Sequence, residues 1–274
     1  MIAKTPVSPL QTQVEYGVTH VPNAPLFRVE NVTVRYGEVV ALRDLSFELQ
    51  TGEQVAVVGP NGAGKSTLFK LMVGEIKPSQ GAITLYGSNP AQHLCVAYVP
   101  QRKTIDWSFP ATVEDVVMMG RVGKIGLFRW AKRHDHAVVQ HSLKRVNAVH
   151  LAKKQIGALS GGQQQRVFIA RALAQEAELM LLDEPLSGLD IPSQEQFFEV
   201  LDGVSKDGIT TIVATHDLNM AAQRFDQVML LNGGIVALGE PAGVLSAENL
   251  TRAYNGHLHT KDDVIIADSC CDHH

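Results

Sequence analysis

A glycine-rich loop followed by lysine and serine is the feature that most constrains this chain. The loop consists of Gly59, Pro60, Asn61, Gly62, Ala63, Gly64, Lys65, Ser66 and Thr67. Its glycines allow backbone N–H groups to turn toward phosphate oxygens without a Cβ in the way. The lysine adds a positive charge for the β- and γ-phosphates, and the serine hydroxyl can bind Mg²⁺. The pattern therefore predicts a site for a nucleotide phosphate chain.

The segments on either side of the loop match what a phosphate-binding loop requires. Residues 54–58 are short and mostly β-branched, which predicts a strand buried on both faces. Residues 65–73 predict a helix that ends at Gly74, with the positive end of its dipole facing the phosphates. A plain glycine-rich turn, the alternative, does not account for this strand–loop–helix order. ATP and Mg²⁺ are the expected ligands.

An acidic pair supplies the second half of the predicted site. Asp183 and Glu184 stand at the end of a predicted buried strand, at the carboxyl edge of the sheet where α/β folds bind ligands. We expect Asp183 to bind Mg²⁺, as the corresponding aspartate does in P-loop ATPases, and Glu184 to act as general base toward water. Taken alone, such a pair is usually a solvated helix cap. The phosphate loop in the same chain favours the catalytic interpretation.

The hydrophobic pattern predicts an α/β fold with two additions. Near the N-terminus, alternating apolar residues predict antiparallel strands at 27–29, 32–34 and 45–49. Later strands are predicted at 179–183, 210–214, 228–231 and 235–238, and a helix at 192–205. Between 101 and 174 the strand signal disappears, and helices are predicted at 112–119 and 135–149. The predicted class is α/β: a P-loop NTPase (RecA-like) core with an N-terminal antiparallel β subdomain and an inserted helical subdomain.

Composition limits the classes of function. The chain has 274 residues, of which 45% are hydrophobic, enough for one large core or two unequal ones. Its formal net charge of -4 offers no positive field to polyanions, so no nucleic-acid partner is expected. Cys95, Cys270 and Cys271 cannot form a disulfide framework and fit a reducing compartment. No signal peptide or long apolar run is present, so a soluble protein is expected whose work at a membrane requires a partner.

The segment Leu159-Ser160-Gly161-Gly162-Gln163 separates this chain from simple P-loop enzymes. Its glycines leave backbone N–H groups available at the N-terminus of a predicted helix at 164–174, a second anion site. With this motif the sequence resembles the ABC transporter ATPase family over essentially all of residues 26–254. The resemblance implies that Ser160 to Gln163 face the γ-phosphate of ATP held by a second copy of the chain. Two nucleotides would then lie between two subunits.

Four further positions match the family one by one. The resemblance implies that Tyr36 stacks on adenine and that Gln101 contacts Mg²⁺ and the attacking water. It implies that Asp190 lies in a loop bridging the two subunits and that His216 hydrogen-bonds the γ-phosphate. The alternatives are ordinary ones: a tyrosine at a strand end, and a histidine with a structural role. No substitution at the matched positions indicates an inactive ATPase.

Residues 99–121 resemble the ATPases of manganese and zinc importers, which carry a similar Gln-Arg…Asp-Trp-x-Phe-Pro…Val-Met-Met-Gly-Arg string. Trp107 and Phe109 follow Gln101 closely and could form an apolar dock for a short helix of a permease. Alternatively, both rings pack inside the helical subdomain, because tryptophan and phenylalanine favour cores.

Three regions are expected along the chain: a flexible arm at 1–25, the ABC ATPase domain at 26–255 with its helical subdomain at about 102–174, and a tail at 256–274. The tail contains possible metal ligands, namely His257, His259, Asp262, Asp263, Asp268, Cys270, Cys271, Asp272, His273 and His274. Such a tail could sense or buffer a metal. A solvated terminus without metal is the alternative, since no tight ligand spacing is present.

The leading functional hypothesis is an ATP-hydrolysing, energy-coupling subunit of an importer for a divalent transition metal, manganese or zinc. The family resemblance implies a homodimer beneath integral-membrane permease subunits, at the cytoplasmic face of the inner membrane, served indirectly by an external solute-binding protein. One alternative is import of another solute, such as an iron chelate. Another is a soluble, non-transport ABC ATPase, although such proteins usually carry two cassettes or long coiled coils and this chain has one phosphate loop.

Overall fold

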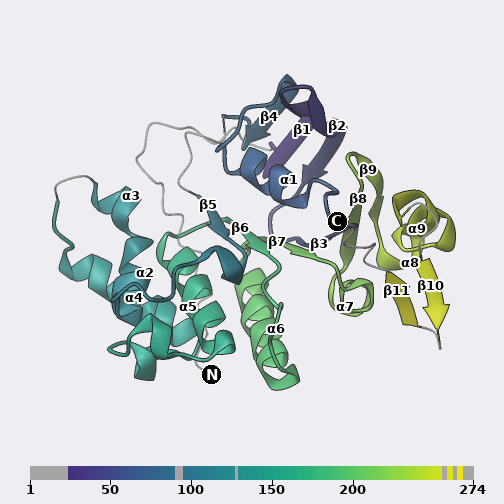
Figure 1. The fold of residues 1–274 in the computed structure, drawn as a ribbon. Coiled ribbons are helices and arrows are strands. Elements are labelled where there is room, and N and C mark those ends of the chain that lie inside the picture. The colour runs from purple at the N-terminus through teal and green to yellow at the C-terminus, as the bar shows by residue number, and fades with distance from the viewer. Residues whose placement is uncertain (1–23, 90–94, 127–128, 255–257, 262–263, 268–274) are drawn as a thin grey trace, which may run out of the picture.

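A six-stranded sheet forms the centre of the molecule (Figure 1). The computed structural model describes residues 24–89, 95–126, 129–254, 258–261 and 264–267. In sequence order, the strands of this sheet are β3 (Gln54–Val58), β5 (Val96–Val99), β6 (Leu179–Asp183), β7 (Thr210–Thr215), β8 (Gln227–Leu231) and β9 (Ile235–Gly239). Their spatial order is β5-β6-β7-β3-β8-β9, with all neighbours parallel except β8 and β9. The α/β core and the closing hairpin are thus confirmed.

A smaller antiparallel sheet of β1 (Phe27–Tyr36), β2 (Val39–Leu49) and β4 (Gln80–Leu85) lies above the central sheet, with order β2-β1-β4. One continuous strand covers both predicted segments 27–29 and 32–34, and the register shifts within it mark an irregularity between them. Strand β4 was not predicted, because its first three residues are exposed and show no apolar alternation. Helix α1 (Lys65–Met72) lies between the two sheets (Figure 1).

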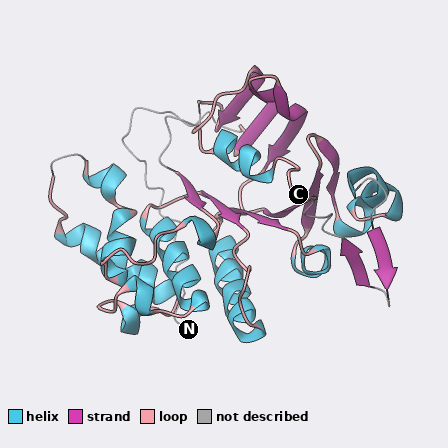
Figure 2. Ribbon diagram, in the orientation of Figure 1, coloured by secondary structure: helices cyan, strands magenta, loops and turns pink. Residues whose placement is uncertain are grey.

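Helices cover the other face of the central sheet and build the helical subdomain (Figure 2). They are α2 (Val113–Met119), α3 (Val122–Ile125), α4 (Arg133–Arg145), α5 (Gly161–Ala174), α6 (Ile191–Lys206), α7 (Leu218–Arg224), α8 (Pro241–Val244) and α9 (Ala247–Tyr254), with short 3₁₀ turns at Arg102–Thr104, Val149–Leu151 and Ile156–Ala158. The predicted helix at 135–149 instead ends at Arg145, because Asn147 adopts a left-handed conformation with φ 53°. Helix α2 begins as predicted, with Thr112 and Asp115 forming a capping box.

Two hydrophobic cores fill the space on opposite faces of the central sheet. In β3, Val55 and Val57 pack with α1 and the antiparallel sheet, whereas Ala56 and Val58 pack with the helices on the other face. All four are fully buried. This alternation follows from the period of two residues in a strand, and it explains why residues 55–58 are all apolar rather than every second one.

The two ends of the chain are described only in part. The predicted arm lies outside the described residues except for 24 and 25, which belong to no helix or strand. In the tail, β10 (Leu258–Lys261) and β11 (Val264–Ala267) pair as an antiparallel hairpin. The proposed metal ligands of the tail lie outside the described residues, apart from His259, for which only the backbone is described. No helix in the described part of the chain is long and apolar enough to cross a membrane.

Arg121 connects three helices of the helical subdomain. Its side chain forms ion pairs with Asp135 at 3.2 Å and with Glu176 at 2.6 Å, and it donates to the carbonyl oxygen of Ala174 at 3.0 Å. The arginine is only 3% exposed. Because the partners come from the start of α4 and the end of α5, this one side chain ties the segment after α2 to both.

Replacing Arg121 with alanine is expected to lower the free energy of unfolding by about 3 kcal/mol, because a buried carboxylate loses its ionic partner. Equilibrium urea unfolding measures the change. Lys70→Ala is the matched control: Lys70 pairs with Glu75 at 3.6 Å with both side chains about half exposed, and its loss should cost less than about 1 kcal/mol. Equal losses for the two variants would show that the Arg121 network does not stabilise the fold.

Candidate active site

Four of the predicted site segments lie at the carboxyl edge of four neighbouring parallel strands. The phosphate loop follows β3, Gln101 follows β5, Asp183 ends β6 and His216 follows β7. Since these strands are adjacent in the order β5-β6-β7-β3, the segments leaving them lie side by side. The sheet topology therefore assembles in space what the sequence keeps far apart.

The phosphate loop is closely packed against the strand that follows α7. A Cβ placed on Gly59 would lie 2.0 Å from the carbonyl oxygen of Leu231, so only glycine fits there. The Gly233 N–H donates to the Ala63 carbonyl oxygen at 2.9 Å, which ties the loop to the β8–β9 turn. The Lys65 ammonium donates to the carbonyl oxygens of Gly59 and Pro60, at 2.7 and 3.0 Å. The loop is therefore wrapped around its own lysine, at the N-terminus of α1.

The charge of Lys65 sits in a largely buried environment. Burial lowers the pKa of the ammonium, while the nearby carboxylates of Glu184 and Asp183 act in the opposite direction. The residue is 8% exposed. A cation held at low solvent exposure beside a helix N-terminus is suited to binding phosphate oxygens.

Asp183 accepts two hydrogen bonds on one carboxylate oxygen. Its Oδ2 accepts from Ser66 Oγ at 3.0 Å and from Tyr98 Oη at 3.2 Å. Burial raises the pKa of the Asp183 carboxyl, and the two hydrogen bonds act in the opposite direction. Burial also raises the pKa of the Tyr98 hydroxyl. Ser66 and Asp183 thus bring two hard oxygen donors together beside the phosphate loop, a donor set that fits Mg²⁺.

Glu184 directly follows β6 and contacts residues of, or just after, the two strands that flank β6. Its N–H donates to the Ala214 carbonyl oxygen at 3.0 Å, and its backbone adopts a left-handed conformation with φ 45°, which is strained for a residue other than glycine. One carboxylate oxygen accepts from Gln101 Nε2 at 2.7 Å, and the other lies 3.7 Å from His216 Nδ1. The structure therefore groups the three residues predicted to be catalytic.

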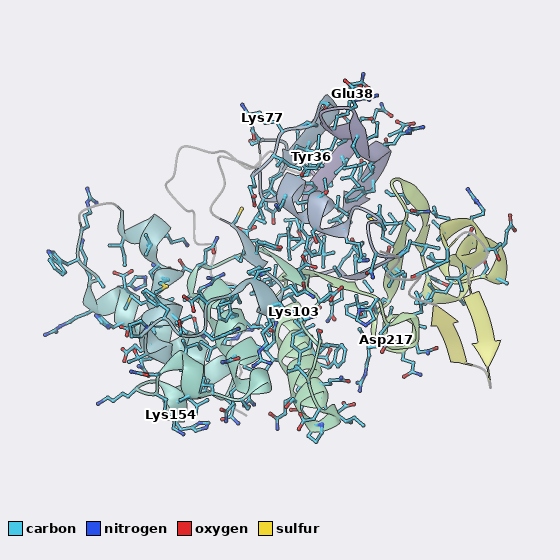
Figure 3. The ribbon with its side chains drawn as sticks, in the orientation of Figure 1. Tyr36, Glu38, Lys77, Lys103, Lys154 and Asp217 are labelled. Carbon is cyan, nitrogen blue, oxygen red and sulfur yellow. The ribbon has the colours of Figure 1, made fainter. Side chains whose placement is uncertain are left out.

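The turn that carries His216 is fixed by hydrogen bonds on both sides of it. The Asp217 N–H donates to Thr215 Oγ1 at 3.1 Å, and the Asp217 carboxylate caps α7 by accepting from the Met220 N–H at 2.9 Å. The side chain of His216 is 68% exposed. Figure 3 shows Asp217 at the start of α7, below the central sheet, and Tyr36 above it on the antiparallel sheet.

The predicted second anion site begins α5. Ser160 and Gln163 form a capping box, in which the Gln163 N–H donates to Ser160 Oγ at 3.4 Å and Gln163 Oε1 accepts from the Ser160 N–H at 3.1 Å. The helix starts at Gly161, three residues before the predicted 164. The glycines also serve packing: a Cβ on Gly161 would meet the Arg102 guanidinium at 2.8 Å, and one on Gly162 would meet Ser193 Oγ at 2.6 Å.

Three predicted site residues remain apart from the phosphate loop. Tyr36 ends β1 and is 49% exposed. Asp190 caps α6 by accepting from the Ser193 N–H at 3.1 Å, and hydrogen bonds from the side chain and the backbone of Ser193 lower the pKa of its carboxyl. Among the described residues, no hydrogen bond joins Tyr36, Ser160 or Asp190 to residues 59–67.

Trp107 and Phe109 behave differently from each other. The Trp107 ring packs edge-on against Phe168 at 5.5 Å, and its indole N–H donates to the Arg102 carbonyl oxygen at 3.0 Å. Packing within the helical subdomain, the alternative considered for both rings, is therefore confirmed for Trp107. Phe109 remains 56% exposed.

Two residues near the site carry contacts that the sequence did not indicate. Arg102 donates to Gln164 Oε1 at 2.9 Å and so connects the segment after Gln101 to α5. Tyr98 reaches Asp183 from the neighbouring strand. Tyr98 lies in β5, which ends beside the site, but its contact with Asp183 follows only from the strand order and register.

Comparison with known proteins agrees with the family resemblance. The family model described as "ABC transporter" matches residues 42–187. The chain is 43% identical to the manganese transport system ATP-binding protein MntB of Halalkalibacterium halodurans, covering 88% of this chain and 98% of that protein. It is 44% identical to the chelated iron transport system membrane protein YfeB of Yersinia pestis, covering 85% and 80%.

A solved structure of an ABC transporter, described as of the metal-chelate type and inward-facing, superposes with a TM-score of 0.76. The two chains are 33% identical, and the match covers 89% of this chain and 96% of that one. The fold class predicted from the sequence is confirmed.

Replacing Glu184 with glutamine is expected to lower ATP hydrolysis by about 100-fold or more, because the proton acceptor for water is removed. Glutamine keeps an oxygen that can accept from Gln101, so nucleotide binding should remain. Phosphate release and binding of a fluorescent ATP analogue measure the two properties. The exposed residue Glu248 on α9 provides the control Glu248→Gln, which should match wild type in both. Full hydrolysis by Glu184→Gln would exclude the general-base role.

Proposed function

The chain belongs to the ABC transporter family. We propose that it drives the import of a divalent transition metal, with manganese as the leading candidate. It is an ATPase of that family. The observation that carries the metal assignment is that relatives matched over at least four-fifths of both chains are named for manganese and chelated iron transport. The matched region includes residues 99–121, where the sequence itself resembles metal importers.

The phosphate loop and Lys65 would hold the phosphates of ATP. Ser66, Asp183 and Gln101 would hold Mg²⁺, with Gln101 using its amide oxygen because its amide nitrogen donates to Glu184. When bound, Mg²⁺ supplies positive charge that offsets the charge of the phosphate oxygens. Glu184 accepts a proton from the attacking water, and His216, at 3.7 Å from Glu184, stands at the same edge for the γ-phosphate. Tyr36, half exposed, offers a ring face to adenine.

We place the second half of each site on another copy of the chain. Ser160 lies exposed at the N-terminus of α5, and Asp190 and Ile191 lie exposed at the start of α6. Ile191 is 74% exposed and would be covered by the partner chain in this arrangement. Two phosphate loops and two Ser160–Gln163 segments would then enclose two ATP molecules.

The remaining partners follow from the importer role. Integral-membrane permease subunits would bind the exposed face of the helical subdomain, where Phe109 supplies an apolar contact. An external solute-binding protein would deliver the metal to those permeases. The chain itself would lie peripherally at the cytoplasmic face of the inner membrane. The formal charge of -4 gives no support to a nucleic-acid partner.

Import of an iron chelate is the second candidate, supported by the 44% identity to the chelated iron system protein. The residues described above act on ATP in either case. The two candidates therefore differ only in the solute that the permease and the external protein bind, and transport measurements separate them.

Dimer formation should require Ser160 of the second copy. With ATP and Mg²⁺, Glu184→Gln is expected to elute as a dimer in size-exclusion chromatography, whereas Glu184→Gln with Ser160→Arg stays monomeric. Loss of the Ser160 cap costs about 1 kcal/mol, so the double variant should still fold. Glu184→Gln with Lys154→Ala is the control and should still dimerise, because Lys154 lies at the lower edge of the helical subdomain and does not belong to the Ser160–Gln163 segment (Figure 3).

The nucleotide affinity of the monomeric variant shows whether Ser160 contacts the ATP of the other copy or the ATP of its own chain. In the proposed dimer, Ser160 contacts only the ATP of the other copy, so monomeric Ser160→Arg should bind a fluorescent ATP analogue like wild type. Weaker binding by the monomer would instead place Ser160 on the ATP of its own chain and contradict the proposal.

Metal transport tests the importer role. In cells lacking the chain, uptake of radioactive Mn²⁺ should fall and be restored by wild type and by Glu248→Gln, but not by Glu184→Gln. Zn²⁺, Fe²⁺ and chelated iron are measured in parallel. Restoration of chelated-iron uptake alone would favour the second candidate, and unchanged uptake of all these solutes would refute the metal assignment.

A further inference from the structure

The hydroxyl of Tyr98 donates a hydrogen bond to Asp183 Oδ2 at 3.2 Å, and the functions above give it no role. We propose that Tyr98 is a positioning residue for Mg²⁺, which orients the Asp183 carboxylate through this hydrogen bond. The proposal rests on Asp183 being the magnesium-binding carboxylate of the proposed function. In this role Tyr98 would act through Asp183 and not on the nucleotide or the reacting atoms themselves.

Strand register brings Tyr98 to this place. β5 and β6 run parallel with Tyr98 paired to Leu181, so the alternation of side chains puts Tyr98, Leu181 and Asp183 on one face of the sheet. That face is the one covered by α1, as shown by the packing of Leu181 with Leu68 and Phe69 in the same core. The tyrosine hydroxyl and the aspartate carboxylate therefore face the same layer.

The tyrosine ring is restrained on the side of α1. Phe69 packs edge-on against it, with ring centroids 6.2 Å apart and an interplanar angle of 77°. The same helix carries Ser66 in its first turn, one turn before Phe69. Helix α1 thus directs one donor to Asp183 and packs the ring that carries the other.

The two hydroxyl groups that donate to Asp183 have different roles in the proposed site. The Ser66 hydroxyl is itself a magnesium ligand in the proposed site, so it has to serve both the metal and Asp183. Tyr98 lies on the neighbouring strand β5 and is not a magnesium ligand in the proposed site, so its hydroxyl does not have to serve the metal as well. Hydrogen bonds to ligating carboxylates from residues behind them typically change metal affinity by about 10- to 100-fold. The hydroxyl of Tyr98 is in the position for such an effect.

The competing explanation is that Tyr98 serves packing alone. A variant that lacks only the hydroxyl oxygen distinguishes this explanation from a positioning role. Tyr98→Phe keeps the ring and its contact with Phe69 but removes the donor. A packing role predicts wild-type behaviour for this variant, whereas a positioning role predicts a specific loss of Mg²⁺ affinity.

The test measures the Mg²⁺ concentration at half-maximal binding for a fluorescent ATP analogue on the full chain. For Tyr98→Phe this midpoint should rise about 10-fold, while affinity for the analogue in EDTA and the melting temperature without nucleotide stay at wild-type values. Tyr254→Phe is the matched control, because Tyr254 is a buried tyrosine on α9, and its midpoint should not move. A wild-type midpoint for Tyr98→Phe overturns the proposal.

A second variant separates this proposal from the role of Asp183 on which it rests. Asp183→Asn should raise the same midpoint, and adding Tyr98→Phe to it should cause little further change, because both act through one carboxylate. If Asp183→Asn shifts the midpoint and Tyr98→Phe does not, only the tyrosine role fails. If Asp183→Asn leaves the midpoint unchanged, the assignment of the magnesium carboxylate fails, and the tyrosine proposal with it.

Discussion

The parallel pairing of β5, β6, β7 and β3 is the constraint on which the rest of the molecule depends. Because parallel strands end at the same edge, Gln101, Asp183, His216 and the phosphate loop come together from distant parts of the chain. The register is stabilised by alternate burial, since neighbouring residues of β3 belong to cores on opposite faces. A slip of one residue in β6 would exchange those faces and turn Asp183 away from Ser66.

The site concentrates features that do not favour stability. A buried ammonium, Lys65, lies near the carboxylates of Asp183 and Glu184, and Glu184 adopts a strained left-handed backbone conformation. Away from the site, the buried Arg121 is compensated by Asp135 and Glu176, and the Lys70–Glu75 pair lies at the surface. Such a distribution is expected where a site is selected for binding and chemistry while the surrounding cores maintain the fold.

Local patterns in the sequence predicted most of what local interactions determine. The strand β3, the helix α1 that follows the glycine-rich loop and the capped helix α2 depend on residues close in sequence, and these elements were confirmed. Strand β4 lacked an apolar alternation, and the end of α4 depended on a left-handed Asn147 that composition does not reveal. The contacts of Tyr98 with Asp183 and of Arg102 with Gln164 join residues far apart in sequence. They follow from strand register and helix packing, which no single segment encodes.

In the proposed assembly, the sheet edge of one chain forms half of an ATP site, with Lys65 and Glu184 on one copy and Ser160 on another. A structure of Glu184→Gln determined with saturating ATP and Mg²⁺ tests this most directly. We expect two ATP molecules between two chains, each touching the phosphate loop of one chain and Ser160 of the other. ATP held by the phosphate loop of a single chain, with Ser160 of every copy still exposed to solvent, would contradict it.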